Sequence, residues 1–345
     1  MGNYLVTGGS GFFGSILCQA LADRGDTVVT IDLQPCPYRH ARVRAVQNDI
    51  RHKEVLEALF RAENFDAVFH CAAMLAHDVK SPQELWSSNV DGTQNVFACC
   101  QTYAVPKIVF ISSNCLWGKS FSYPVSEEEP PAPVEIYGRS KLAGEKILLS
   151  DPDRVHSIIF RSPTIMDEGR LGLLGILFEF IDEGRKLWQV GDGTNRYQFI
   201  YAKDLATACI AALDYPKCAV FNIGSDNVKT FNEVYTAVLR QSGSTSKLAY
   251  FPKWLAIPAM KIAYALGLSP LGPYQYKMIA SSFVFDTTAI KRELSWRPTL
   301  TNEAMLLRAY TYYHDHKQEI AHRTNMSAHN VVARMGIIRL LKWLS

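Results

Sequence analysis

The 345-residue sequence has no Cys-x-x-Cys pair and no cluster of histidines and cysteines at the spacing of a zinc site. Its 8 cysteines are scattered, apart from the neighbours Cys99 and Cys100. We therefore expect reduced thiols, a cytoplasmic setting and no bound metal. The formal net charge is only +3 and no long basic run occurs, so we expect no nucleic acid partner.

Long apolar runs are also missing. No stretch is long enough to cross a bilayer, and the chain enters a strand pattern at once with NYLVTGG, so we expect no signal peptide. The C-terminal stretch VVARMGIIRLLKWLS differs, because apolar and basic residues alternate in it at helical spacing. Such a helix can lie on a membrane surface, or it can dock on the protein's own core or on a second subunit. We interpret residues 316–345 as a polar linker, HRTNMSAHN, followed by this helix.

The first half of the sequence alternates short apolar runs with helical patterns. The runs typical of strands are NYLVTG, TVVTID, VRAVQNDI, AVFHCAA, KIVFISS and VHSIIFR. The helical patterns between them are SILCQALADRG, KEVLEALFRAE, the stretch from Pro82 to about Tyr103, and YGRSKLAGEKILL. This alternation predicts an α/β fold with a doubly wound parallel sheet and helices on both faces.

Past residue 165 the order loosens into helices with short strands such as VFNIG. We predict a first domain over residues 1–165, to which residues 200–222 return. A smaller, mixed α/β substrate lobe is predicted over residues 166–315.

The stretch VTGGSGFFG supplies Gly8, Gly11 and Gly14 between the first strand and the first helix. Glycines there let the backbone approach a pyrophosphate, which then lies at the positive helix N-terminus. Asp32 ends the second strand roughly 20 residues further on, where a carboxylate accepts hydrogen bonds from both ribose hydroxyls and repels a 2′-phosphate. The sequence therefore predicts a Rossmann-type domain that binds NAD rather than NADP. Asp49, at the end of VQND, is a candidate contact to the adenine or a carboxylate of a surface loop.

The stretch EIYGRSK adds Tyr137 and Lys141, one helical turn apart. With these motifs, the chain resembles the extended, NAD-dependent epimerase/dehydratase branch of the short-chain dehydrogenase/reductases. The resemblance covers about residues 2–315 and follows the family's order. Its matches are the glycine motif, DI at 49–50, HCAA at 70–73, NVDGTQN at 89–95, SSNCLWG, YGRSK, GDGTNRYQFIYAKDLA and VFNIG.

The resemblance implies that Ser113, Tyr137 and Lys141 are catalytic. Turn chemistry alone would explain the polar residues that follow KIVFI, but Ser113 falls at the family's catalytic Ser/Thr. Tyr137 is then the general acid/base, Lys141 its helper, and Ser113 orients the reacting oxygen. The resemblance also implies a set of cofactor-binding residues: Gly8, Gly11, Phe12, Phe13, Gly14, Asp32, Asp49, Ile50, Ala72, Ala73, Asn89, Tyr137, Lys141 and Pro163.

Oxidation of a secondary alcohol requires removal of its hydroxyl proton while hydride leaves the carbon. A free tyrosine has a pKa of about 10, and lowering it by roughly three units needs about 4 kcal/mol of preferential stabilisation of the phenolate. We expect Lys141 on the same helix face, together with the oxidised nicotinamide, to supply that stabilisation.

Asn114 and Cys115 follow Ser113 at positions where water-eliminating members of the family carry acidic residues, which argues against a dehydratase. In the similar GDP-fucose synthases a cysteine at this spacing shuttles a proton together with a histidine, but no histidine occurs here between Thr164 and Asn195. We therefore interpret Cys115 as a small buried residue.

Arg196 in GDGTNRYQF matches the position where nucleotide-sugar enzymes hold the substrate diphosphate, although a surface arginine or an ion pair between the lobes would also explain it. Asn114 and Thr164 are the other candidate substrate contacts. Many nucleotide-sugar enzymes have an asparagine in the segment that reads RSPTIMDEG here, and its absence removes a usual contact.

The leading hypothesis is an NAD-dependent sugar-nucleotide epimerase that acts at C4 through a keto intermediate. The apolar stretch FPKWLAIPAMKIAYALGL motivates an alternative, an NAD-dependent dehydrogenase/reductase of a hydroxysteroid, a lipid-linked sugar or another apolar secondary alcohol. A dinucleotide-binding sensor without activity is the least favoured class. By analogy with the family we expect a homodimer through helices at about 82–103 and 136–150, and the C-terminal helix is a candidate membrane contact.

Overall fold

The computed structural model describes residues 1–75, 81–269, 271–322, 332–333, 335–336 and 338–343. Within this part of the chain, a 7-stranded sheet has the order β10-β6-β5-β4-β1-β2-β3, and all neighbouring strands are parallel. Its strands are β1 (Asn3–Thr7), β2 (Thr27–Asp32), β3 (Val43–Gln47), β4 (Ala67–His70), β5 (Lys107–Ser113), β6 (His156–Ser162) and β10 (Ala219–Asn222). The predicted doubly wound parallel sheet is thus confirmed.

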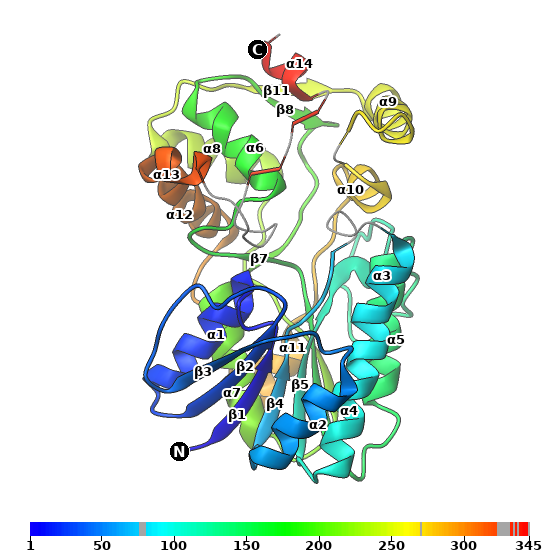
Figure 1. The fold of residues 1–345 in the computed structure, drawn as a ribbon. Helices are drawn as coiled ribbons and strands as arrows, with labels where there is room; N and C mark the ends of the chain where they lie inside the picture. Colours follow the sequence, from blue (N-terminus) through cyan, green and yellow to red (C-terminus); the bar gives the residue numbers. More distant parts are fainter. Residues whose placement is uncertain (76–80, 270, 323–331, 334, 337, 344–345) are drawn as a thin grey trace.

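Helices cover both faces of this sheet (Figure 1). One face packs against α1 (Phe12–Asp23), α7 (Ala202–Ala211) and α11 (Thr288–Glu293). The other face packs against α2 (Lys53–Ala62), α4 (Gly92–Thr102) and α5 (Ile136–Leu148). Because helices cover both faces, β5 is buried at every residue, and its sequence is therefore mainly apolar on both sides.

The helical segment predicted from Pro82 to about Tyr103 is interrupted by a wider turn. It consists of α3 (Pro82–Trp86), the π-helical turn η1 (Ser87–Asp91) and α4. Such π-turns often occur at functional sites. This one carries the buried Asn89 toward the loop that follows β4.

A second lobe lies above the carboxyl ends of the sheet strands (Figure 1). It contains two small parallel sheets, one of β7 (Thr164–Met166) with β9 (Phe199–Tyr201) and one of β8 (Leu187–Val190) with β11 (Leu248–Phe251). Its helices are α6 (Leu173–Asp182), α8 (Phe231–Ser242), α9 (Lys253–Ala265), α10 (Pro273–Met278), α12 (Asn302–Asp315), α13 (Lys317–Ala321) and α14 (Ile338–Trp343). Short 3-10 turns are η2 (Asn114–Leu116) and η3 (Ala212–Asp214).

The described part of the C-terminal segment docks on this second lobe. Lys342 of α14 forms ion pairs with Glu179 and Glu183, and Ile338 packs against the apolar core of the lobe. The stretch HRTNMSAHN, interpreted above as a linker, lies outside the described residues except for His322. Arg334, Ile337 and Leu344 of the predicted C-terminal helix also lie outside them. No helix among the residues described has both the length and the apolar character to cross a membrane.

A buried ion pair joins α5 to strand β6 of the large sheet. Arg161 Nη2 of β6 lies 2.8 Å from Glu145 Oε2 of α5, and both side chains are less than a tenth exposed. Ser112 at the end of β5 donates a 2.6 Å hydrogen bond to Glu145 Oε1. Arg161 Nη1 also donates to the backbone oxygen of Glu127, and the guanidinium lies over the ring of Trp117. These contacts set the position of α5 relative to β5 and β6.

Replacing Glu145 with Gln is predicted to lower the free energy of unfolding by about 3 kcal/mol, because Arg161 is left buried without a counter-charge. Urea denaturation measures the change. Glu57→Gln, which breaks the exposed pair of Glu57 with Lys53, is the control and should cost less than about 0.5 kcal/mol. Equal losses in the two variants would show that the buried pair does not hold α5 to the sheet.

Candidate active site

A cavity of about 1410 Å³ lies between the two lobes, above the point where the chain order of the sheet reverses between β1 and β4. In open parallel sheets this is where ligands bind. Of the residues predicted for the site, those that line it are Gly8, Gly11, Phe12, Phe13, Gly14, Asp32, Asp49, Ile50, Ala72, Ala73, Ser113, Asn114, Tyr137, Lys141, Pro163 and Thr164. Two predicted residues, Asn89 and Arg196, lie outside the lining.

The glycine loop is packed so closely that side chains would not fit. A Cβ on Gly14 would lie 2.0 Å from the backbone oxygen of Gly8. Gly8 itself has φ +74°, and a Cβ there would lie 2.6 Å from the backbone nitrogen of Ala72. α1 begins directly after Gly11, which makes no side-chain cap, so the first amides of the helix face the cavity side of the loop. This cradle fits the diphosphate of a dinucleotide.

Asp32 stands at the carboxyl end of β2, on the cavity wall. Its Oδ2 accepts from the Ser10 N–H and its Oδ1 from the Gln34 N–H, each at 2.9 Å. Burial raises the pKa of Asp32, and these backbone hydrogen bonds oppose the rise. The carboxylate is therefore fixed at the cavity wall, and its contact to the ribose of NAD stays a prediction.

Asp49 is held by Arg51, whose Nε donates to Asp49 Oδ2 at 2.8 Å. Burial alone would raise the pKa of Asp49, but the hydrogen bonds from Arg51 lower it. The carboxylate is therefore ionised and oriented at the cavity edge. Its contact to the adenine stays a prediction.

Asn89 takes a place different from the predicted one. Its Oδ1 accepts from the Met74 N–H at 2.7 Å, and its Nδ2 donates to the Met74 oxygen at 3.0 Å and to Ser140 Oγ at 3.1 Å. Both ends of the amide are therefore occupied by the protein, behind the loop after β4. Asn89 positions this cavity-lining loop on α5, while the predicted contact with the cofactor does not follow from the geometry.

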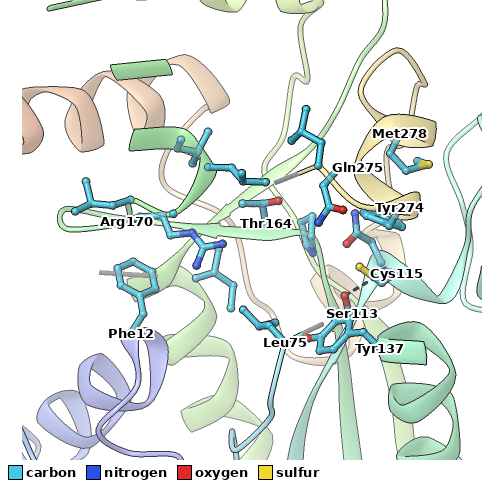
Figure 2. A pocket seen from close by; sticks show the side chains of 18 of the residues that line it. Phe12, Leu75, Ser113, Cys115, Tyr137, Thr164, Arg170, Tyr274, Gln275 and Met278 are labelled. Carbon is cyan, nitrogen blue, oxygen red and sulfur yellow. Dashed lines mark hydrogen bonds between the residues drawn. The ribbon is translucent and has the colours of Figure 1, made fainter. Parts of the chain in front are cut away.

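Ser113 and Tyr137 lie side by side at the floor of the cavity, with Cys115 next to them (Figure 2). Ser113 Oγ accepts a hydrogen bond from the Cys115 N–H at 3.1 Å, which fixes the hydroxyl at the end of β5. Burial raises the pKa of the Tyr137 phenol, and Cys115 adds to the rise. A hydrogen bond with Ser113 and the cation of Arg170 oppose it.

Lys141 lies one turn further along α5, fully buried at the sheet side of the cavity. Its Nζ donates to the Ile111 backbone oxygen at 2.8 Å and lies 4.5 Å from the centre of the Phe110 ring. Burial lowers the pKa of Lys141 from its ordinary 10.5 to about 8. The group is thus still a cation at neutral pH, as the expected support of Tyr137 requires. In the structure, however, the groups that lower the pKa of Tyr137 most are Ser113 and Arg170.

The substrate candidates divide into those that face the cavity and one that does not. Asn114 Nδ2 donates a 2.6 Å hydrogen bond to Tyr197 Oη, and both residues line the cavity, as does Thr164. Arg196 points away: its side chain is exposed and donates to the backbone oxygen of Val228. The motif GDGTNRYQF therefore brings Tyr197, and not the predicted Arg196, to the site.

Three further residues of the site were missed by sequence reasoning. Arg170 reaches into the cavity beside the ring of Phe12, 5.6 Å from its centre (Figure 2). Tyr274 of α10 lies opposite, with its Oη 3.2 Å from that of Tyr197. Glu135, just before α5, also lines the cavity, and burial raises the pKa of its carboxyl. The signal for Arg170 is its place directly after the MDEG turn, and that for Glu135 is its place at the start of the EIYGRSK stretch, whereas no motif marks Tyr274.

Cys115 lines the cavity between these groups. Burial raises the pKa of its thiol to about 12, so the thiol is protonated at neutral pH. A protonated thiol is a poor nucleophile and a weak hydrogen-bond donor. The thiol is only partly buried and faces the cavity, which differs from the interpretation of Cys115 as a buried residue.

The sequence signature of the NAD dependent epimerase/dehydratase family matches residues 4–224. The chain belongs to this family. An uncharacterized protein, y4nG of Sinorhizobium fredii, is 33% identical over 341 residues, which cover 98% of this chain and 85% of that protein. A UDP-glucose 4-epimerase of Lacticaseibacillus casei is 28% identical over 288 residues, with 75% and 87% covered. The predicted NAD-dependent enzyme of this branch is therefore confirmed at the level of the family.

Solved structures share the fold. The UDP-glucose 4-epimerase of Thermotoga maritima with UDP-glucose has a TM-score of 0.76 at 23% identity and covers 91% of this chain and 99% of that one. The enzyme WbmG of Bordetella bronchiseptica in complex with NAD has a TM-score of 0.76 at 19% identity, with 97% of each chain covered. At these identities the likeness concerns the fold.

The pKa of Lys141 gives a prediction for stability. Because the folded state holds the proton of Lys141 less tightly than the unfolded state, the charge opposes folding below about pH 8, and this cost disappears as the pH rises toward 10.5. Relative to Lys141→Met, the wild type should therefore gain about 2 kcal/mol of unfolding free energy between pH 7 and roughly pH 10. Urea titrations of both proteins at the two pH values measure this difference.

Lys146→Met removes an exposed lysine from the same helix and is the matched control. Its stability should follow that of the wild type over the same pH range. A constant difference between wild type and Lys141→Met would contradict the lowered pKa.

Proposed function

We propose that the protein is an NAD-dependent epimerase that inverts C4 of a nucleotide sugar through a transient ketone. One observation carries the proposal: Ser113, Tyr137 and Lys141 face the same cavity as the glycine cradle and Asp32. A UDP-glucose 4-epimerase that is 28% identical over most of this chain supports the choice of reaction and of substrate class.

The residues of the chain would handle the proton of the reaction. Tyr137 accepts the proton of the C4 hydroxyl and later returns it to the oxygen of the ketone. Ser113, whose hydroxyl is fixed by the Cys115 N–H, binds that oxygen and orients it. NAD, held by the glycine cradle and Asp32, would supply the acceptor and the donor of the C4 hydride when bound, so that no net oxidation would occur.

The raised pKa of Tyr137 suits the half of the reaction in which the phenol donates its proton. The other half needs a phenolate, which requires positive charge nearby. Arg170 on the cavity wall and Lys141 on the same helix provide it from the protein side. Substrate that fills the cavity would exclude water, and the attraction between these cations and the phenolate would then become stronger.

Tyr137→Phe is predicted to lower the rate of sugar epimerisation at least about a hundredfold while the protein still binds NAD. Turnover is measured with UDP-glucose, and bound NAD is quantified by mass spectrometry after denaturation. Tyr123→Phe, which removes the hydroxyl of a half-exposed tyrosine outside the cavity, is the control and should retain full activity. Activity that survives in Tyr137→Phe would remove Tyr137 from its assigned role.

A second candidate is the oxidation of an apolar secondary alcohol, and the upper part of the cavity favours it. We call this part the upper chamber; it is formed by residues of α6, α8, β8, β11 and α9, such as Leu177, Phe180, Trp188, Phe251 and Met260. The described charged residues that line the whole cavity are Asp32, Asp49, Glu84, Glu135, Lys141 and Arg170, and none of these belongs to the elements of the upper chamber. Phosphates placed there would lack a cationic partner among them, whereas an uncharged apolar group would bury its surface.

An activity assay separates the two candidates. For the epimerase we expect conversion of UDP-glucose without accumulation of NADH, because the hydride returns to the sugar. For the dehydrogenase, a hydroxysteroid would yield stoichiometric NADH and UDP-sugars would be inert. That second result would overturn the epimerase proposal and leave Tyr137 as the base of an oxidation.

A further inference from the structure

The outer side of α9 exposes large apolar residues to solvent. Trp254 is 76% and Ile262 62% exposed, and the chain just after the helix adds Leu266 at 66%. Leu255, Tyr264 and Leu268 are close to half exposed. Figure 1 shows α9 at an outer corner of the second lobe. We call these six residues the α9 patch.

The inner side of α9 forms part of the wall of the upper chamber. Ala256, Met260 and Ala263 recur at helical spacing and line the upper chamber. Of the α9 patch only Leu255 also lines the cavity, so the other five residues are not needed to form the chamber wall. A helix that is apolar on both sides is normally buried, and a contiguous exposed apolar surface marks a site of interaction.

The charges of the segment that carries the α9 patch have one sign, although the exposed Asp192 of another segment interacts with Lys253. From Val234 to Phe285 the sequence contains no Asp and no Glu, whereas Arg240, Lys247, Lys253, Lys261 and Lys277 are all cationic. Lys253 and Lys261 are on α9 itself and are exposed. Apolar residues with a tryptophan, flanked by lysines, are the features of a helix that lies in the interface of an anionic membrane.

A second copy of the chain is a poorer occupant of this surface. In a two-fold symmetric dimer the same patch meets itself, so the lysines of both copies would face each other without carboxylates from this segment. The C-terminal helix, the first candidate for a membrane contact, is also a poorer one. Lys342 of α14 is already paired with Glu179 and Glu183 of the protein.

We propose that the α9 patch docks on an anionic lipid surface, with the axis of α9 parallel to the membrane plane. Leu255 is half exposed and also lines the cavity, so the docked helix would place the wall of the upper chamber against the lipid. The proposed docking depends only on the α9 patch, so it does not depend on which of the two candidate activities is correct.

The test is co-sedimentation of the full chain with vesicles of phosphatidylcholine, with and without phosphatidylglycerol. The wild type should sediment with the anionic vesicles, less so at high salt, and only weakly with the neutral ones. The double variant Trp254→Asp/Ile262→Asp should lower partitioning into anionic vesicles by about tenfold or more. Leu149→Asp is the matched control, because Leu149 is an exposed leucine at the end of α5; it should sediment like the wild type.

Each remaining outcome overturns the proposal. Wild type that stays in solution with anionic vesicles shows that the patch does not bind lipid, and equal binding by wild type and double variant places the contact elsewhere. If the wild type is a dimer without vesicles and the double variant a monomer that still epimerises, the patch binds a second copy. Hydrogen exchange of the wild type with vesicles needs no variant: protection should appear over residues 253–268, and its absence there rejects the docking.

Discussion

The geometry of the site depends on the buried ion pair between Glu145 and Arg161. Glu145, Lys141 and Tyr137 are spaced by four residues along α5, so they lie on one face of the helix. Ser112, which donates to Glu145, is the neighbour of Ser113. A buried pair of this kind adds little net stability, since desolvation of both charges offsets their attraction, but it admits few alternative arrangements. The ion pair therefore fixes the position of the Tyr137 phenol relative to the Ser113 hydroxyl.

Burial is the largest cause of the pKa shifts of the groups at the floor of the cavity. It disfavours the charged form of each group, so Tyr137, Cys115 and Glu135 have raised pKa values, and Lys141 has a lowered one. At this end of the cavity, burial favours the protonated forms of the phenol, the thiol and the Glu135 carboxyl. The positive charges of Lys141 and Arg170 oppose this effect on Cys115 and Tyr137, respectively. The described charged residues that line the cavity all lie outside the apolar upper chamber.

Much of this could be predicted from the sequence, because the motifs concerned have local causes. Short stretches of chain determine three of these features: the tight loop in which only glycine fits at positions 8 and 14, the carboxylate at the end of β2, and the Tyr-x-x-x-Lys pair on one helix face. What failed depends on contacts between distant segments. Arg196 and Tyr197 are neighbours in a recognisable motif, but which of the two faces the cavity is decided by Val228 and Asn114. Arg170 belongs to no recognised motif, and Asn89, predicted to line the cofactor, holds the loop after β4 through Met74 and lies outside the cavity lining.

The π-turn η1 shifts the phase of the helix that contains it. Each residue of an α-helix advances the side chain by about 100°, so the one additional residue in the turn rotates everything after it relative to α3. In the observed phase Val96 and Phe97 of α4 point into the core beneath the sheet, while Asn89 still reaches the loop beyond β4. A regular helix over the same residues would change the angle between these two groups of side chains about the helix axis. The irregularity thus links the packing of one layer of the fold to the shape of the cavity wall, and makes the length of this segment intolerant of single-residue insertions or deletions.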